Sequence, residues 1–446
     1  MFKIKPVKLL SVLMIGIGLP TLGFAQQTVT LKDALKYAIE NNTNAKKAVL
    51  EMDMGKFKTQ EVRAQALPQI NGNVGLTYNA IVGQMVADIG GQTQTFKMGQ
   101  PWNSTAGVQL SQQLFNQQVF TGLKAARASE DYYRLNAQLT QEQVIEQVAN
   151  NYYQVLVNRQ QLNVINNNIK NVKVVERIIA DQYKNGLAKK IDVDRISVNI
   201  TNLTTQKEQV ENSIDMLENQ LKLSMGMPVN NEIVLPASEL TEVETLPLLA
   251  DTIAVSNRTE FKILDVQRNL LDLQRKAYVS EYYPSLALNA NYNYTGMGQK
   301  FDFLNTSPNG IGFDASAIGL TLRIPIFNGF LTRAKVRQAD VEIKQYEADR
   351  METKNALDFA YENAKIQLRN SLNTINSQKK NAELAEEIYK STQNNYNNGL
   401  ASLTDLLDTE NSLTQAQNSY NQALLNYKIA EIQLIKSQGN IKSLVN

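Results

Sequence analysis

The feature that most constrains this chain is a helical turn that occurs twice. The segments Tyr183–Leu187 and Tyr396–Leu400 share the pattern Tyr-x-x-Gly-Leu, and their glycines lie about 213 positions apart. Each glycine separates two long segments with apolar residues at helical spacing, which predicts a helix end followed by a tight turn. The chain must therefore fold the same helical hairpin twice, and this duplication organises the rest of its pattern.

The placement of proline predicts that these helices are very long. No proline occurs between Pro101 and Pro228, and none follows Pro325. Because proline breaks a helix interior, two long proline-free spans rich in Asn, Gln, Lys, Glu and Leu favour uninterrupted helices. Apolar residues at 3-4 spacing over Val119–Lys184, about 66 residues, predict a rod of about 100 Å. The same pattern begins again at Arg333.

Shorter helices flank the long ones in each half. We expect closing helices after the two turns and entering helices before the strands, at Ile191–Met225, Leu403–Lys436, Leu31–Leu67 and Leu248–Tyr283. Pro68 and Pro284 end the two entering helices, because proline cannot continue a helix. A closing helix stacked end to end on an entering helix matches a long rod in length, so each chain would supply four columns of helix.

The apolar period changes from 3.6 to 2 directly after Pro68 and Pro284. In the second half, Leu286, Leu288 and Ala290 share one face of such a segment. We predict strands at about residues 69–79, 104–114, 285–295 and 315–326. The polar loops between them are Val82–Asn103, which is rich in Gly, and Thr295–Asp314. Each pair of strands is expected to form a hairpin with one apolar and one polar face.

These signals divide the chain into four parts. Lys3, Lys5 and Lys8 precede an apolar run over Leu9–Leu19, and small residues end at Ala25, so residues 1–25 are predicted to be a signal peptide. The first structural repeat covers residues 26–228 and the second covers 248–446. A connector that contains Pro236 and Pro247 joins them at residues 229–247.

Composition excludes several classes of function. The chain has no Cys and no His, which excludes disulfides, thiol chemistry, His-based triads and the common zinc sites. It carries no phosphate-binding loop or nucleophile motif, so we expect neither an enzyme nor a cofactor. Loss of three lysines with the signal peptide changes the formal charge from +2 to about −1, which gives no basic surface for nucleic acid.

The four strands have the length and pattern of membrane strands. About ten residues with a continuous apolar face are enough to cross a bilayer as a tilted β-strand. Aromatic residues stand near the strand ends, as in interfacial girdles, at Trp102, Phe115, Tyr282, Tyr283 and Phe327. The alternative is a small soluble sheet covered by the helices.

Membrane strands would require the chain to oligomerise. Four strands cannot close, and open strand edges cannot exist in lipid. The smallest membrane barrels have about eight strands, and three copies of this chain would give twelve. The predicted fold is therefore mainly α with a membrane β-barrel contribution. A trimer would combine a 12-strand β-barrel with a 12-helix α-barrel that encloses water.

The chain resembles the TolC family of outer-membrane efflux proteins over Leu31 to the C-terminus. The resemblance rests on the two Tyr-x-x-Gly-Leu turns, the Leu67-Pro68 and Tyr283-Pro284 entries to strands, and the Leu114-Phe115-Asn116 and Ile326-Phe327-Asn328 exits. It implies a homotrimer in the outer membrane of a Gram-negative bacterium, with a periplasmic tunnel. Its implied partners are outer-membrane lipid, a periplasmic adaptor (membrane fusion) protein and an inner-membrane transporter, with passive conduction of the substrates handed over.

The resemblance also implies a periplasmic gate at the turns. Members of this family close the tunnel with a tyrosine, an arginine and aspartates; the matching positions here are Asp192, Tyr396, Asp405 and Asp408. Ala401 stands where some members have the arginine, which leaves Lys189 or Lys190 as substitutes. Three copies of two carboxylates around a narrow pore would favour cations.

Simpler roles for the same residues remain open. Asp405 lies three residues after Ser402, the spacing of a capping box, and Asp408 also fits a solvated surface carboxylate. The predicted adaptor-docking tip consists of Gly186, Leu187, Gly399 and Leu400. Its glycines suit a turn with positive φ, and its leucines either seat the adaptor or pack within the turn.

A second class of function stays open at this point. A non-channel envelope protein, structural or adhesive, would also contain long coiled-coil helices. It would lack membrane strands, so partitioning with the outer membrane separates the two hypotheses.

Overall fold

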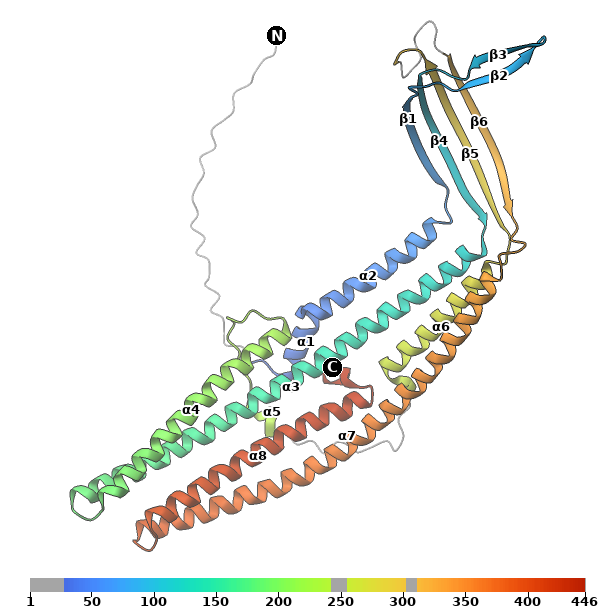
Figure 1. Ribbon diagram of the computed structural model, residues 1–446. Coiled ribbons are helices and arrows are strands. Elements are labelled where there is room, and N and C mark those ends of the chain that lie inside the picture. The colour runs from blue at the N-terminus through green and yellow to red at the C-terminus, as the bar shows by residue number, and fades with distance from the viewer. Residues whose placement is uncertain (1–27, 242–254, 302–310, 446) are drawn as a thin grey trace, which may run out of the picture.

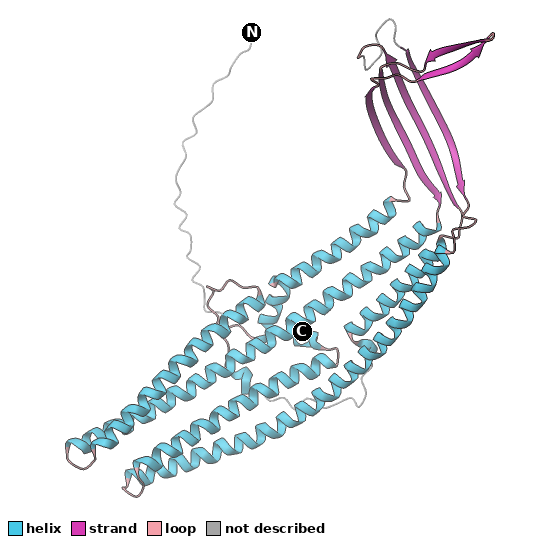
Figure 2. Ribbon diagram, in the orientation of Figure 1, coloured by secondary structure: helices cyan, strands magenta, loops and turns pink. Residues whose placement is uncertain are grey.

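The computed structural model describes residues 28–241, 255–301 and 311–445. The predicted signal peptide, at residues 1–25, lies outside the described residues, as does the end of the predicted connector from residue 242. The described chain has two parts: a long body of helices and a four-stranded sheet at one end of it (Figure 1, Figure 2).

The two halves of the chain repeat one order of elements. The first half runs through α1 (Leu31–Asn41), α2 (Thr43–Ala64), β1 (Gln69–Tyr78), β4 (Trp102–Phe115), α3 (Gln117–Lys184) and α4 (Lys190–Met225). The second runs through α6 (Thr259–Ser280), β5 (Ser285–Gly298), β6 (Ile311–Arg323), α7 (Leu331–Asn397) and α8 (Leu403–Ser437). The predicted unit of helix, two strands, long helix and shorter helix is confirmed. Short elements are α5 (Ser238–Thr241) and the 3₁₀ turns η1 (Val255–Asn257) and η2 (Ile441–Leu444).

The sheet is antiparallel throughout, in the order β1-β4-β5-β6. The β4–β5 pairing joins the two halves, whereas β1 and β6 form the edges. β6 ends at Arg323, opposite Ser285, rather than near residue 326 as expected. The reason is Pro325, which has no N–H to donate to a ladder and also restricts the residue before it.

The predicted Gly-rich loop at Val82–Asn103 contains a second hairpin that sequence reasoning missed. β2 (Gln84–Ile89) and β3 (Gln92–Lys97) pair through a two-residue turn at Gly90 and Gly91. Both glycines have positive φ, 64° and 82°, which is the requirement of the primed hairpin turns. The Gly-Gly pair between two short runs was therefore the available signal.

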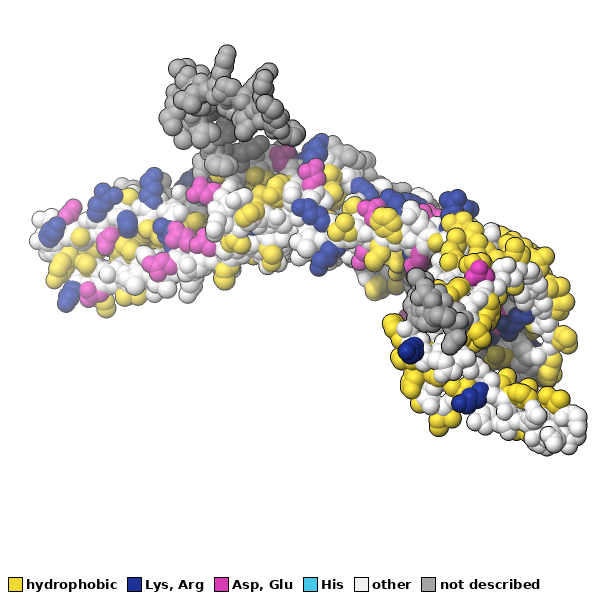
Figure 3. Space-filling model, turned by 90° about the horizontal axis from the view of Figure 1, so that it is seen from above, with side chains coloured by type: hydrophobic (Ala, Val, Ile, Leu, Met, Phe, Trp, Pro, Cys, Tyr) yellow, Lys and Arg dark blue, Asp and Glu magenta, His cyan; other side chains and the backbone are white. Residues whose placement is uncertain are grey.

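One face of the sheet exposes large apolar side chains to the surroundings. Ile318 is 82% exposed and Val74 is 72% exposed, and Ile70 and Leu320 are also exposed. Seen from above, hydrophobic side chains gather over the outside of the sheet, while charged side chains are scattered along the helices (Figure 3). At the end of the sheet away from the helices, the Trp102 ring lies 4.8 Å from that of Tyr78 and 5.5 Å from that of Phe301.

Both entering helices differ from the prediction. The first breaks at Asn42, whose backbone is not helical (ψ 132°) and whose side chain accepts from the backbone N–H of Asn44 and Ala45 to cap α2. Its amide Nδ2 donates to Ser224 O at 2.7 Å, so a contact with α4 is part of the break. The second helix begins at Thr259 instead of Leu248, because η1 and the extended Arg258 precede it.

The closing and entering helices stack end to end, as expected. α4 ends at Gly226, which packs so closely on the α1–α2 junction that an added Cβ would lie 2.4 Å from Asn41 O. α8 meets α6 in the same way, where Arg258 Nη1 donates to Ser437 O at 3.1 Å. The two long helices, α3 and α7, are one column each, and each end-to-end stack forms one more. The chain therefore presents four columns of helix (Figure 1). None of the described helices has a stretch long and apolar enough to cross a membrane.

Candidate functional site

The two predicted turns lie together at the end of the helical body opposite the sheet (Figure 1). Both have the Schellman hydrogen-bond pattern, in which the N–H after the glycine bonds back across the last helical turn. Leu187 N donates to Gln182 O and Leu400 N donates to Asn395 O, each at 2.8 Å. The glycines between, Gly186 and Gly399, have φ of 72° and 75°, a region where side chains are strained.

The leucines that follow these glycines point into the surroundings. Leu187 is 81% exposed and Leu400 is 79% exposed. Packing within the turn therefore does not bury them, and both are available to a partner. Their role in docking an adaptor stays a prediction.

Behind the turns, all four helices contribute to one apolar cluster. It contains Val172, Val175 and Ile179 from α3, Ile196 and Leu203 from α4, Tyr389 from α7, and Leu403, Leu406, Leu407 and Leu413 from α8. Tyr396 packs against this cluster while half-buried. The two helical hairpins, α3–α4 and α7–α8, are therefore held to each other at the tip by apolar contacts.

Two of the predicted gate residues come together across the hairpins. Burial raises the pKa of Tyr396 on α7, and the negative charge of Asp192 on α4 raises it further. Asp192 itself lies in the first turn of α4, where a carboxylate is favourable near the helix N-terminus. The charge of Asp192, in the first repeat, thus acts on Tyr396 in the second.

The two other predicted gate residues have different surroundings. Asp405 completes the capping box expected from its spacing: its Oδ2 accepts from Ser402 N at 2.9 Å and from Ser402 Oγ at 2.7 Å. These hydrogen bonds stabilise the carboxylate and hold the pKa of Asp405 below its ordinary value. Asp408, one turn further along α8, is exposed. Both carboxylates face the surroundings, and Asp405 also caps its helix.

Sequence reasoning missed the arginine that reaches across the tip. Arg195 Nη1, from α4, donates to Thr404 Oγ1, on α8, at 2.7 Å. The duplication was the available signal: with an offset of about 213, Arg195 occupies the position in the first repeat that is equivalent to Asp408 in the second. Lys189, one of the two expected substitutes, is the N-cap residue of α4 and makes no side-chain capping hydrogen bond.

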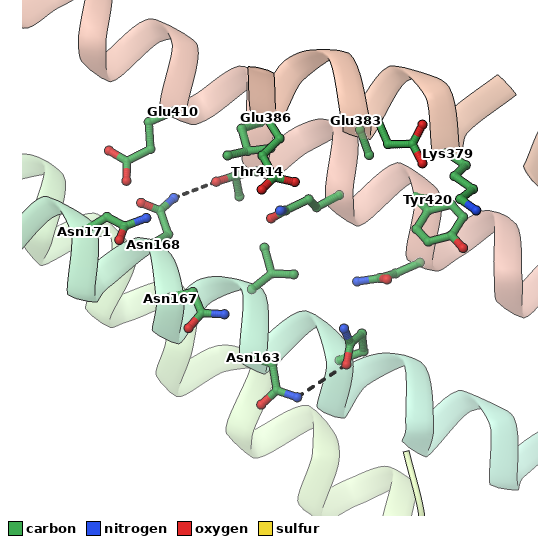
Figure 4. Close-up of a pocket in the computed structure, with 16 residues that line it drawn as sticks. Asn163, Asn167, Asn168, Asn171, Lys379, Glu383, Glu386, Glu410, Thr414 and Tyr420 are labelled. Atoms are coloured by element: carbon green, nitrogen blue, oxygen red, sulfur yellow. Dashed lines mark hydrogen bonds between the residues drawn. The ribbon is translucent and has the colours of Figure 1, made fainter. Parts of the chain in front are cut away.

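A polar cavity of about 360 Å³ lies between α3, α7 and α8, next to the tip cluster (Figure 4). Its lining includes Asn168 and Asn171 from α3 and Glu410 from α8. Glu410 is buried, and this burial raises its pKa to about 8. Among the residues that the structure describes, no group of three or more Asp, Glu, Cys or His side chains is placed to hold a metal ion.

Four helical columns that end in an antiparallel sheet with an exposed apolar face define the class of outer-membrane channels. The family model "Outer membrane efflux protein" matches residues 34–227 and 253–440, one match to each half of the chain. The chain belongs to this family. It is an outer-membrane channel for efflux or secretion, which decides against a non-channel envelope coiled-coil protein.

Individual relatives support the same assignment. The outer membrane protein TolC of Vibrio cholerae is 22% identical over 452 residues, which covers 98% of this chain and 96% of TolC. The alkaline protease secretion protein AprF of Pseudomonas aeruginosa is 23% identical over 420 residues, covering 90% of this chain and 82% of AprF.

Solved structures show the same fold at low sequence identity. The outer membrane protein VceC of Vibrio cholerae superposes with a TM-score of 0.70 at 16% identity, covering 92% of this chain and 96% of VceC. The outer-membrane channel CmeC of Campylobacter jejuni gives a TM-score of 0.72 at 14% identity, covering 92% of this chain and 85% of CmeC.

Proposed function

We propose that the chain works as a homotrimer that joins a 12-strand outer-membrane β-barrel to a 12-helix periplasmic tunnel. The observation that carries this proposal is the sheet, which has an exposed apolar face and two edge strands, β1 and β6. Unpaired strand edges are not tolerated in lipid, and four strands are too few to close. Pairing β6 of one copy with β1 of the next removes every edge when the ring closes.

In this trimer the helical tip is the periplasmic gate, formed by Asp192, Tyr396, Asp405 and Asp408. The apolar tip cluster holds the two hairpins together, and the Arg195–Thr404 hydrogen bond adds a polar bridge between them. Three copies of the exposed carboxylates place a negative field at the narrow end of the tunnel, which favours cations.

The exposed leucines at the turns form the docking tip. Leu187 and Leu400, each set by the preceding glycine, present apolar surface to a periplasmic adaptor protein. The adaptor links the tunnel to an inner-membrane transporter, which selects the substrates. The channel then conducts them passively, without catalysis, a cofactor or nucleic acid. The mature chain consists of two repeats, residues 26–228 and 248–446, joined by a connector at 229–247 after removal of the signal peptide at 1–25.

Cation selectivity tests the gate. The double variant Asp405→Asn with Asp408→Asn removes the carboxylates while keeping the side-chain shapes. In planar-bilayer recordings it should lose cation preference. Asp53→Asn is the control, because Asp53 is an exposed carboxylate on α2, paired with Lys56 and far from the tip. Unchanged selectivity in the double variant would show that these residues do not form the constriction.

A further inference from the structure

Glu410 is a buried carboxyl group that the proposed gate does not use. It lies on α8, is only 3% exposed, and its Oε1 has no hydrogen-bond partner among the described residues. Its side chain lines the cavity between α3, α7 and α8 (Figure 4). A buried carboxylate without a partner is costly, so the group must be neutralised or compensated.

The charged side chains around the cavity do not neutralise the Glu410 carboxylate. The α3 side of the lining consists of amide and apolar side chains, and the titratable groups that face the cavity from α7 and α8 are Lys379, Glu383, Glu386 and Tyr420. Lys379 lies beside Tyr420, at the far end from Glu410 (Figure 4). Burial alone raises the pKa of Glu410 to about 8. The pKa of Tyr389 is raised to about 12, first by burial and then by the negative charge that an ionised Glu410 carries. At pH 7 only about one Glu410 in ten is then ionised.

For a protonated Glu410, a hydrogen-bond acceptor without a partner lies on α3. Asn168 is 5% exposed, and its Nδ2 donates to Thr414 Oγ1 at 2.6 Å while its Oδ1 has no partner among the described residues. Glu410 and Thr414 lie four residues apart on one face of α8, and Asn168 lies between them (Figure 4). A neutral carboxyl is a hydrogen-bond donor, so its O–H supplies the bond that Asn168 Oδ1 lacks.

We propose that protonated Glu410 donates to Asn168 and thereby acts as a proton-operated lock between the two helical hairpins. The contact joins α8 of one hairpin to α3 of the other, next to the apolar tip cluster. Ionisation removes the donor and leaves an uncompensated charge at a buried position, so it weakens the contact and favours an open tip. This inference rests on the proposed role of the tip as a gate.

The direction of the pH dependence follows from the raised pKa. Below the ordinary value of 4.5 the lock is fully present, and it is lost as the pH rises through about 8. If Glu410 has its ordinary pKa in the open tip, each Glu410 raises the ratio of open to closed tips by at most about tenfold per pH unit between those values. Three protomers that open together multiply this effect.

The test compares the full-length channel with its Glu410→Gln variant in planar bilayers from about pH 6 to about pH 9, a range that brackets the raised pKa. Gln keeps the shape and a donor amide but cannot ionise. Wild type should open increasingly as the pH rises, whereas E410Q should stay closed at every pH. Glu386→Gln is the matched control, because Glu386 lines the same cavity but pairs with Lys390, and it should keep the wild-type profile.

Infrared titration of the carbonyl stretch gives an independent measurement that does not need a conducting channel. Wild type should show a protonated carboxyl band at pH 7 that disappears as the pH rises, and E410Q should lack it. No band in wild type at pH 7 would mean an ionised, cation-compensated Glu410 and would overturn the lock. Identical pH profiles in wild type and E410Q would overturn it too, whereas the absence of any wild-type channel would refute the proposed function instead.

Discussion

Removing the Arg195 guanidinium should loosen the closed tip. Arg195 Nη1 donates to Thr404 Oγ1 at 2.7 Å and joins α4 to α8 at an exposed position. Such a hydrogen bond contributes about 0.5–1 kcal/mol, because water competes for both groups. Three copies in the proposed trimer contribute about 1.5–3 kcal/mol, which corresponds to roughly 10- to 150-fold in the ratio of closed to open tips.

Planar-bilayer recordings at constant pH measure that ratio. Arg195→Ala should raise the fraction of time spent open, and Thr404→Val, which removes the acceptor with little change in shape, should do the same. The double variant should open no more than either single variant, because the two side chains act through one contact. Arg177→Ala serves as the control, since Arg177 Nε donates to Lys173 O in its own helix. If both single variants stay as tightly closed as wild type, this contact does not hold the tip and another latch must.

Two further substitutions test the turn and the helix stack. Gly399→Ala should cost about 1 kcal/mol of unfolding free energy, because its φ is 75° but no atom lies within 4 Å of the added Cβ. Gly226→Ala should cost several times more, since its Cβ would lie 2.4 Å from Asn41 O; equal midpoints in thermal unfolding would contradict this packing. Leu400→Ser should leave stability unchanged because the side chain is exposed, yet reduce cross-linking of the tip to the adaptor. Undiminished cross-linking would exclude this leucine from docking.

Local patterns were enough to predict the repeated elements. The prolines at 68 and 284 lie between an entering helix and a strand in each half, and both turns depend on a glycine with positive φ. The capping box at Ser402 and Asp405 is equally local, because its partners are three residues apart. Such features depend on a few neighbouring residues, so the spacing of residues in the sequence is enough to predict them.

Features that depend on distant segments escaped sequence reasoning. The break at Asn42 involves a bond to Ser224, 182 positions away, and the Arg195–Thr404 bridge spans 209 positions. Glu410 lies at helical spacing from Leu406 and Leu413, so the local sequence placed it on the apolar face of α8. Only the packing of α3 and α7 on that face decided which side chains surround the carboxyl group.

The twice-repeated Tyr-x-x-Gly-Leu turn by itself determined that this chain folds two equal helical hairpins, because in each copy a left-handed glycine ends one long helix and helical spacing resumes a few residues later. Which side chains meet at that turn was decided only by the tertiary structure. The packing of the two hairpins brought Arg195 to Thr404, Asp192 near Tyr396, and Glu410 beside Asn168. These contacts depend on how the helices pack side by side, and spacing along one helix does not encode that.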